Sequence, residues 1–217
     1  MSKPWQILAR PASFWRAFRA YFGGGFRGRR EPVADRDGLA RFLESRASYV
    51  AQVSLYGYLR TRAGMRYPEL FSNDEFVKAI DAARWQVWLA CLSDLSVYAG
   101  GLLAGRTRAD PAWIGPLMTA TFEAILAASE QTHDAARVER VRARLALCDW
   151  TAVSDDGTPF SESPRAVIEC APIVDELKQL DEEIVRNSVR FRWQEVRREL
   201  RRDLDADAML ASEASRS

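Results

Sequence analysis

Few residues in this chain have the type and spacing of a reactive centre. Glu130 and His133 are three residues apart, which is the spacing of a carboxylate and histidine pair on one helix of a di-iron bundle. His133 is the only histidine, whereas such a site needs two pairs and further glutamates, so we expect no metal there. Cys91, Cys148 and Cys170 are far apart and form no C-x-x-C pair, which argues against a disulfide framework or a zinc site and favours a reducing, cytoplasmic setting.

The familiar catalytic motifs are absent from the sequence. It contains no G-x-S-x-G elbow, no phosphate-binding G-x-x-x-x-G-K-[ST] loop, no H-E-x-x-H and no dinucleotide-binding glycine fingerprint. A nucleophilic mechanism that needs histidine could use only His133. The sequence names no reaction and no cofactor, and it favours a protein that is not an enzyme.

One acidic side chain lies within an apolar stretch. Residues 76–103 are hydrophobic on nearly every side of a helix, which predicts a central, buried helix with Asp94 in its middle. A buried, unpaired carboxylate is costly, so Asp94 should meet a cation, a hydroxyl or a proton. Arg46 falls among the apolar positions of the preceding helix, and we expect a buried polar site formed by Arg46, Asp94 and Tyr98. This site is either a structural ion pair or the wall of a ligand pocket that also includes Trp88.

The same stretch could instead cross a membrane. Residues 85–105 reach the length of roughly 20 residues that a bilayer requires. An aspartate at the centre of a lone span costs about 3 kcal/mol, however, and Gly100 and Gly101 weaken the helix. We therefore favour a buried helix.

The N-terminal segment separates aromatic from basic side chains. In residues 13–22, SFWRAFRAYF, the rings gather on one side of a helix and the two arginines on the other, as in helices that lie in a membrane interface. Three glycines, 23–25, are expected to form a hinge before a second basic cluster. The residues predicted to bind a membrane or a partner are Phe14, Trp15, Arg16, Phe18, Arg19, Tyr21, Phe22, Arg27, Arg29 and Arg30.

Charge is distributed unevenly between this arm and the remainder. Residues 1–30 hold seven basic and no acidic residues, so they carry +7 and leave −6 on the rest of a chain whose net charge is +1. Such asymmetry predicts an anionic partner for the arm. We expect an anionic membrane surface, with the protein's own core or a protein partner as alternatives. A nucleic acid is disfavoured because its stacking platforms need rings and arginines side by side, and the absence of acids also resembles a mitochondrial targeting segment.

The remaining periodicity predicts an all-α protein. We expect an irregular bundle of about five or six helices around the central one. Residues 1–30 would form the amphipathic arm, 31–205 a single helical domain and 206–217 a flexible tail. Asp35 or Asp37, one of Ser72, Asn73 or Asp74, and Asp134 are expected to cap helices. Residues 64–74 read as a connection, and residues 166–170, AVIEC, as a short strand without a partner.

These patterns favour a peripheral membrane protein on the cytoplasmic, inner face of a membrane. It would act as an adaptor, assembly factor or accessory subunit, with the arm on lipid and the helical body on a protein partner. The alternative is a soluble helical enzyme or small-ligand-binding protein with its pocket near Asp94. Self-association is left open by the sequence.

Overall fold

The computed structural model describes residues 32–129, 134–154 and 158–216, and within these ranges the chain is all-α, as the sequence predicts. One isolated bridge joins Val33 to Leu204, and the described residues form no strand. The α-helices are α2 (Arg36–Ala63), α3 (Tyr67–Leu70), α4 (Asp74–Arg106), α5 (Ile114–Ala128), α6 (Ala135–Ala146), α7 (Glu162–Cys170), α8 (Asp175–Asp203) and α9 (Ala206–Ala214). Two short 3-10 turns, Gly64–Arg66 and Pro111–Trp113, precede α3 and α5.

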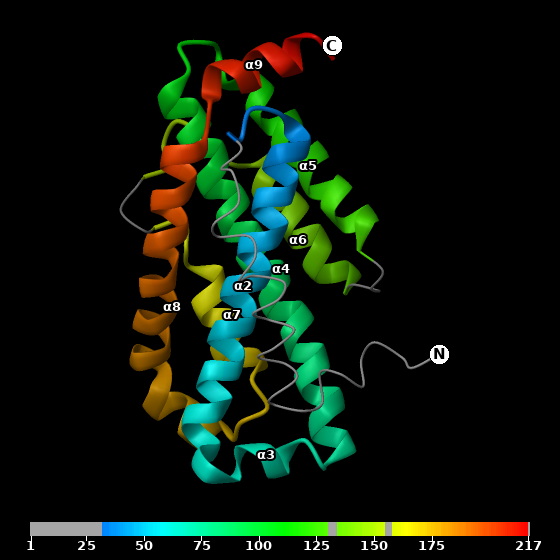
Figure 1. The fold of residues 1–217 in the computed structure, drawn as a ribbon, viewed down its shortest axis with the longest axis vertical. Helices are drawn as coiled ribbons and strands as arrows, with labels where there is room; N and C mark the ends of the chain where they lie inside the picture. Colours follow the sequence, from blue (N-terminus) through cyan, green and yellow to red (C-terminus); the bar gives the residue numbers. More distant parts are fainter. Residues whose placement is uncertain (1–31, 130–133, 155–157, 217) are drawn as a thin grey trace.

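Helix α4 is the centre of the bundle and contacts α2, α5, α6 and α7 (Figure 1). Its side chains from Cys91 to Gly101 are all buried, which confirms the prediction of a central buried helix. Among the described helices, α4 alone is long and apolar enough to cross a bilayer, but 83% of its most apolar window is buried by the bundle. That burial is what a core helix requires, because its apolar surface is already removed from water.

Three of the expected caps begin helices. The side chains of Asp35, Asn73 and Asp134 accept hydrogen bonds from backbone N–H groups in the first turns of α2, α4 and α6 respectively. These bonds satisfy donors that have no partner inside a helix. The sequence therefore predicted correctly where the chain enters the three helices.

The loop after α6 packs against α4 at two glycines, Gly100 and Gly101. A Cβ atom on Gly100 would lie 2.3 Å from the ring of Trp150, and one on Gly101 would lie 2.4 Å from Val153. Any larger side chain at either position would displace the loop. Because Gly100 and Gly101 have no side chains, residues 150–153 can pack directly against helix α4.

Two segments differ from their predicted structure. Residues 166–170, expected as a short strand, form the second half of helix α7, where Ala166 and Val167 pack into the core on a helical period. The tail expected to be flexible contains α9, which Asp205 caps and whose Met209 is fully buried. The connection at residues 64–74 also includes the short helix α3. In each case packing against the bundle stabilises a helix that local propensity alone does not specify.

Candidate functional site

Asp94 lies at the centre of a saturated polar cluster. Its side chain is completely buried, and its Oδ1 accepts a hydrogen bond from Arg144 Nη1 at 2.8 Å. The same Oδ1 accepts from the backbone N–H of Glu162 at 3.2 Å, while Oδ2 accepts from the N–H of Ser163 at 2.8 Å and from its hydroxyl at 2.7 Å. Arg144 Nη1 also donates to Ser93 Oγ at 2.9 Å. The prediction that Asp94 is buried and meets a cation, a hydroxyl or a proton is confirmed, because it binds both a cation and a hydroxyl.

This cluster holds the N-terminus of α7 in place. Ser161, the residue before the helix, makes no side-chain cap, and Asp94 instead accepts the N–H groups of Glu162 and Ser163. A carboxylate suits this position because the N-terminus of a helix carries partial positive charge. Ser163 Oγ in turn accepts a hydrogen bond from Trp193 Nε1 of α8 at 2.9 Å. We call Asp94, Arg144, Ser163 and Trp193 the Asp94 clasp, since it joins α4, α6, α7 and α8.

The clasp has little capacity left for chemistry. Burial raises the pKa of Asp94, opposed by the charge of Arg144 and the hydrogen bonds from Ser163. Both carboxylate oxygens already accept hydrogen bonds, and Arg144 Nη2 is committed to the carbonyl of Pro159 at 2.9 Å. Burial also raises the pKa of the neighbouring Cys91 thiol well above its ordinary value, which keeps it in the unreactive form. The geometry is that of a structural ion pair.

A surface hollow of about 480 Å³ lies beside the clasp. It is lined by Ser93, Arg144 and Glu162, the polar neighbours of Asp94, but Asp94 itself is not part of its wall. Asp94 does not line the hollow, because its carboxylate is buried against Arg144 and Ser163, and the ligand pocket expected near Asp94 stays a prediction.

The other two residues of the predicted polar site are placed differently. The prediction paired Asp94 with Arg46, but Arg144 takes that role, and Arg46 Nε binds Glu199 Oε2 of α8 at 2.7 Å. Tyr98 is buried one helical turn from Asp94, where its ring packs on Phe160 at 5.2 Å between centroids. Periodicity placed Arg46 on the correct inner face of its helix but could not say which carboxylate that face meets.

Several predicted residues lie outside the described ranges. Residues 1–31 contain the whole membrane or partner-binding arm, from Phe14 to Arg30, and residues 130–133 contain the Glu130 and His133 pair. In the part of the chain that is described, no group of three or more His, Cys, Asp or Glu side chains could hold a metal ion.

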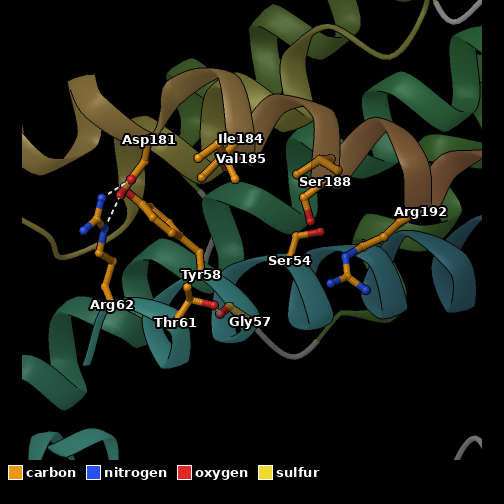
Figure 2. Close-up of a pocket in the computed structure, with 11 residues that line it drawn as sticks. Ser54, Gly57, Tyr58, Thr61, Arg62, Asp181, Ile184, Val185, Ser188 and Arg192 are labelled. Carbon is orange, nitrogen blue, oxygen red and sulfur yellow. Dashed lines mark hydrogen bonds and ion pairs between the residues drawn. The ribbon is translucent and has the colours of Figure 1, made fainter. Parts of the chain in front are cut away.

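A second polar region, not foreseen from the sequence, lies in a groove between α2 and α8 (Figure 2). Its volume is about 430 Å³, within the usual range for small-molecule sites. One end holds Asp181, which binds both Arg62 and the hydroxyl of Tyr58, the latter at 3.0 Å. The hydrogen bond from Arg62 lowers the pKa of Asp181, while burial and the hydrogen bond to Asp181 raise the pKa of Tyr58 to about 12.

At the other end of this groove, some polar groups have no hydrogen-bond partner among the described residues. Arg192 reaches from α8 toward α2, where its guanidinium would contact a Cβ placed on Gly57 at 3.6 Å. Among the described residues no carboxylate forms an ion pair with it, its Nε is buried without a hydrogen bond, and partial burial lowers its pKa. Ser54 is only 5% exposed, and its Oγ makes no hydrogen bond within the described ranges. In Figure 2 Ser54 and Ser188 point toward one another beside Arg192.

Helix α8 lies along one edge of the bundle (Figure 1) and carries three large apolar side chains that are exposed. Leu180, Ile184 and Phe191 are 75%, 70% and 71% exposed, and their spacing of four and seven residues places them on one side of the helix. We call these three residues the α8 outer stripe.

Sequence reasoning did not single out Arg144 or Arg192. A usable signal existed, since Arg144 is three residues after buried Val141 and Arg192 three after buried Val189, so each borders a buried face.

Comparisons with protein-family models, with curated proteins and with solved structures found no match to this chain.

Proposed function

We propose that this protein is a non-enzymatic α-helical adaptor or accessory subunit at the inner face of a membrane. The proposal is carried by the sequence pattern of residues 13–22, which on a helix would set the rings and the arginines on opposite sides, together with a charge of +7 in the first 30 residues. Rings at the headgroup boundary and arginines on anionic phosphates are the two contacts of an interfacial helix. The α8 outer stripe supports the second half of the proposal, because exposed apolar side chains in a row are typical of a protein interface.

Vesicle flotation of the full chain tests the membrane contact. Replacing Arg16 and Arg19 by glutamate should weaken binding to phosphatidylserine-containing vesicles by more than about tenfold, since each arginine contributes about 1 kcal/mol near an anionic leaflet. The matched control replaces Arg108 and Arg140, two exposed arginines of the body, by glutamate, which changes the net charge equally. An equal loss of vesicle binding in both variants, or no binding by the wild-type chain, would contradict the proposal that the N-terminal arm makes the membrane contact.

A second variant separates ring insertion from simple charge attraction. Replacing Phe14 and Phe18 by serine removes apolar area without changing charge, and we expect it to weaken binding even at low ionic strength. If only the arginine variant loses binding, the arm is an electrostatic contact that does not enter the interface.

A second candidate function, binding of a small phosphorylated ligand, is favoured by the open end of the α2–α8 groove. The Arg192 guanidinium, which forms no ion pair with a described carboxylate, and two hydroxyls, on Ser54 and Ser188, supply donors for a tetrahedral oxyanion. Tyr58, Ile184 and Val185 line the same groove and offer apolar surface for the rest of such a molecule. The site of this second proposed function lies in the helical body, between α2 and α8 and not at Asp94.

Isothermal titration with inorganic phosphate and with phenyl phosphate tests this second function. We expect phenyl phosphate to bind more tightly, and Arg192→Gln to weaken it at least tenfold, because a hydrogen bond to a charged group contributes about 1.5–3 kcal/mol. Arg190→Gln, an exposed arginine two positions away that does not line the groove, is the control. Absence of binding, or an equal effect of the two variants, would rule out this site.

A further inference from the structure

The α8 outer stripe has the spacing of a coiled-coil seam. Leu180, Ile184, Asn187 and Phe191 follow one another at steps of four, three and four residues, which is the alternation of positions a and d in a heptad. All four are exposed, so this seam has no cover among the described residues. A single helix with such a seam is expected to pack against another helix.

We propose that the seam pairs, antiparallel, with the same seam of a second copy of this chain. The inference rests on the proposed function in one respect, since it identifies the protein partner of the α8 face, and it requires no membrane. Antiparallel packing of position a against position d sets Leu180 opposite Phe191 of the second copy and Ile184 opposite its Asn187. A two-fold axis between the helices forms each of these contacts twice.

The charges beside the seam favour this partner and this direction. Glu183 and Arg190 are seven residues apart, so both occupy position g, and both are exposed. Neither forms an ion pair with any of the described residues. In the antiparallel register Glu183 faces Arg190 of the second copy, and the symmetry produces this pair twice.

A parallel pair would lose part of this complementarity. In parallel helices position g faces position e of the partner's next heptad, so Glu183 would face the uncharged Ser188 and only Arg190, opposite Glu195, would meet an opposite charge. The antiparallel arrangement gives both Glu183 and Arg190 an opposite charge.

Asn187 within the seam fixes the register. A polar residue at a core position lowers the stability of a helix pair but disfavours registers that bury it differently. Here it lies at the middle of the exposed seam and faces Ile184 of the second copy, so the pair forms at a cost in stability. The pairing is therefore specific but not strong, and its dissociation should be visible on dilution.

Analytical ultracentrifugation of the full chain without lipid tests this pairing. We expect a monomer–dimer equilibrium at micromolar concentration, and a monomer for Ile184→Glu. Leu147→Glu, which changes an 86% exposed apolar residue at the end of α6, is the matched control and should leave the equilibrium unchanged. Because Ile184 is itself 70% exposed, its substitution should not unfold the chain, and circular dichroism checks this.

A charge exchange tests the direction of the helices. Glu183→Arg and Arg190→Glu should each weaken the dimer about tenfold, because two attractive pairs become two repulsive ones. The double variant restores opposite charges across the antiparallel seam, and its dissociation constant should return to within about threefold of wild type.

Three results would overturn the pairing: a wild-type monomer at high micromolar concentration, a dimer that survives Ile184→Glu, or a double variant no better than the single ones. A wild-type monomer would mean that another segment or partner covers the seam. Because these experiments contain no lipid, their failure leaves the vesicle result unaffected, and failure of vesicle binding leaves the dimer unaffected.

Discussion

The Asp94 clasp and the α2–α8 groove are both polar regions at helix contacts, but they differ in how completely their polar groups are paired. In the clasp, each oxygen of the buried carboxylate accepts at least two hydrogen bonds. In the groove, Arg192 has no carboxylate among the described residues and Ser54 Oγ has no hydrogen bond there. A saturated cluster stabilises the fold, whereas an unsaturated one can still gain interactions from a ligand. The comparison separates a structural site from a candidate binding site, although the sequence drew attention only to the first.

The largest effect that would sharpen this comparison is expected at Arg144. Arg144→Met removes the cation from a fully buried carboxylate and should lower the free energy of unfolding by about 3–5 kcal/mol. Urea denaturation measures it. Arg140→Met, one turn earlier and exposed on the same helix, is the control and should change stability by less than about 0.5 kcal/mol. If the Arg144 variant lost no more than this control, the clasp would not be structural.

Glycine substitutions test how closely each region is packed. Gly100→Ala near the clasp would set its Cβ 2.3 Å from Trp150 and should destabilise the protein by about 1–3 kcal/mol. Gly57→Ala in the groove meets no atom of the described residues closer than 3.6 Å and should stabilise α2 by roughly 0.5–1 kcal/mol through helix propensity. Thermal and urea unfolding of the two variants should therefore shift in opposite directions. Destabilisation by both would mean that the groove is closed in solution.

The ion pair between Arg62 and Asp181, at one end of the groove, predicts a loss of stability in acid. The hydrogen bond from Arg62 lowers the pKa of Asp181 in the folded state. The resulting stability is complete above the ordinary aspartate pKa of about 3.9 and is lost as the pH falls through the lower folded value. Urea unfolding between about pH 5 and pH 2 should thus be less pH-dependent in Asp181→Asn than in wild type. The exposed substitution Asp207→Asn should retain the wild-type slope, and an unchanged slope in Asp181→Asn would refute the assignment.

The smallest stability effect is expected at the open end of the groove. Arg192→Gln removes a partly desolvated guanidinium that has no ion pair with a described carboxylate, so the free energy of unfolding should change by less than about 0.5 kcal/mol. The same variant is expected to lose phosphate binding. A destabilisation of the size expected for Arg144→Met would place Arg192 among the structural residues and remove the contrast between the two regions.

Much of the helical framework could be predicted from local patterns. The apolar period of residues 76–103 indicated a central helix, and short polar side chains at Asp35, Asn73 and Asp134 indicated where helices begin. These features depend on residues within one or two turns of each other, so they can be read along the chain. Residues 166–170 and α9 could not be assigned in this way, because their helical structure is stabilised by contacts with distant parts of the bundle.

By itself the sequence determined that the protein is all-α, that its longest apolar helix is central, and that Asp94 needs a polar partner. Only the tertiary structure decided that this partner is Arg144 of α6 and not Arg46, and that Ser163 and Trp193 complete the cluster. It also decided that Arg192 has a groove beside it and that Leu180, Ile184 and Phe191 face outward. The physical reason is that periodicity fixes the face of a helix on which a side chain lies, whereas the packing of helices distant in sequence fixes what that face meets.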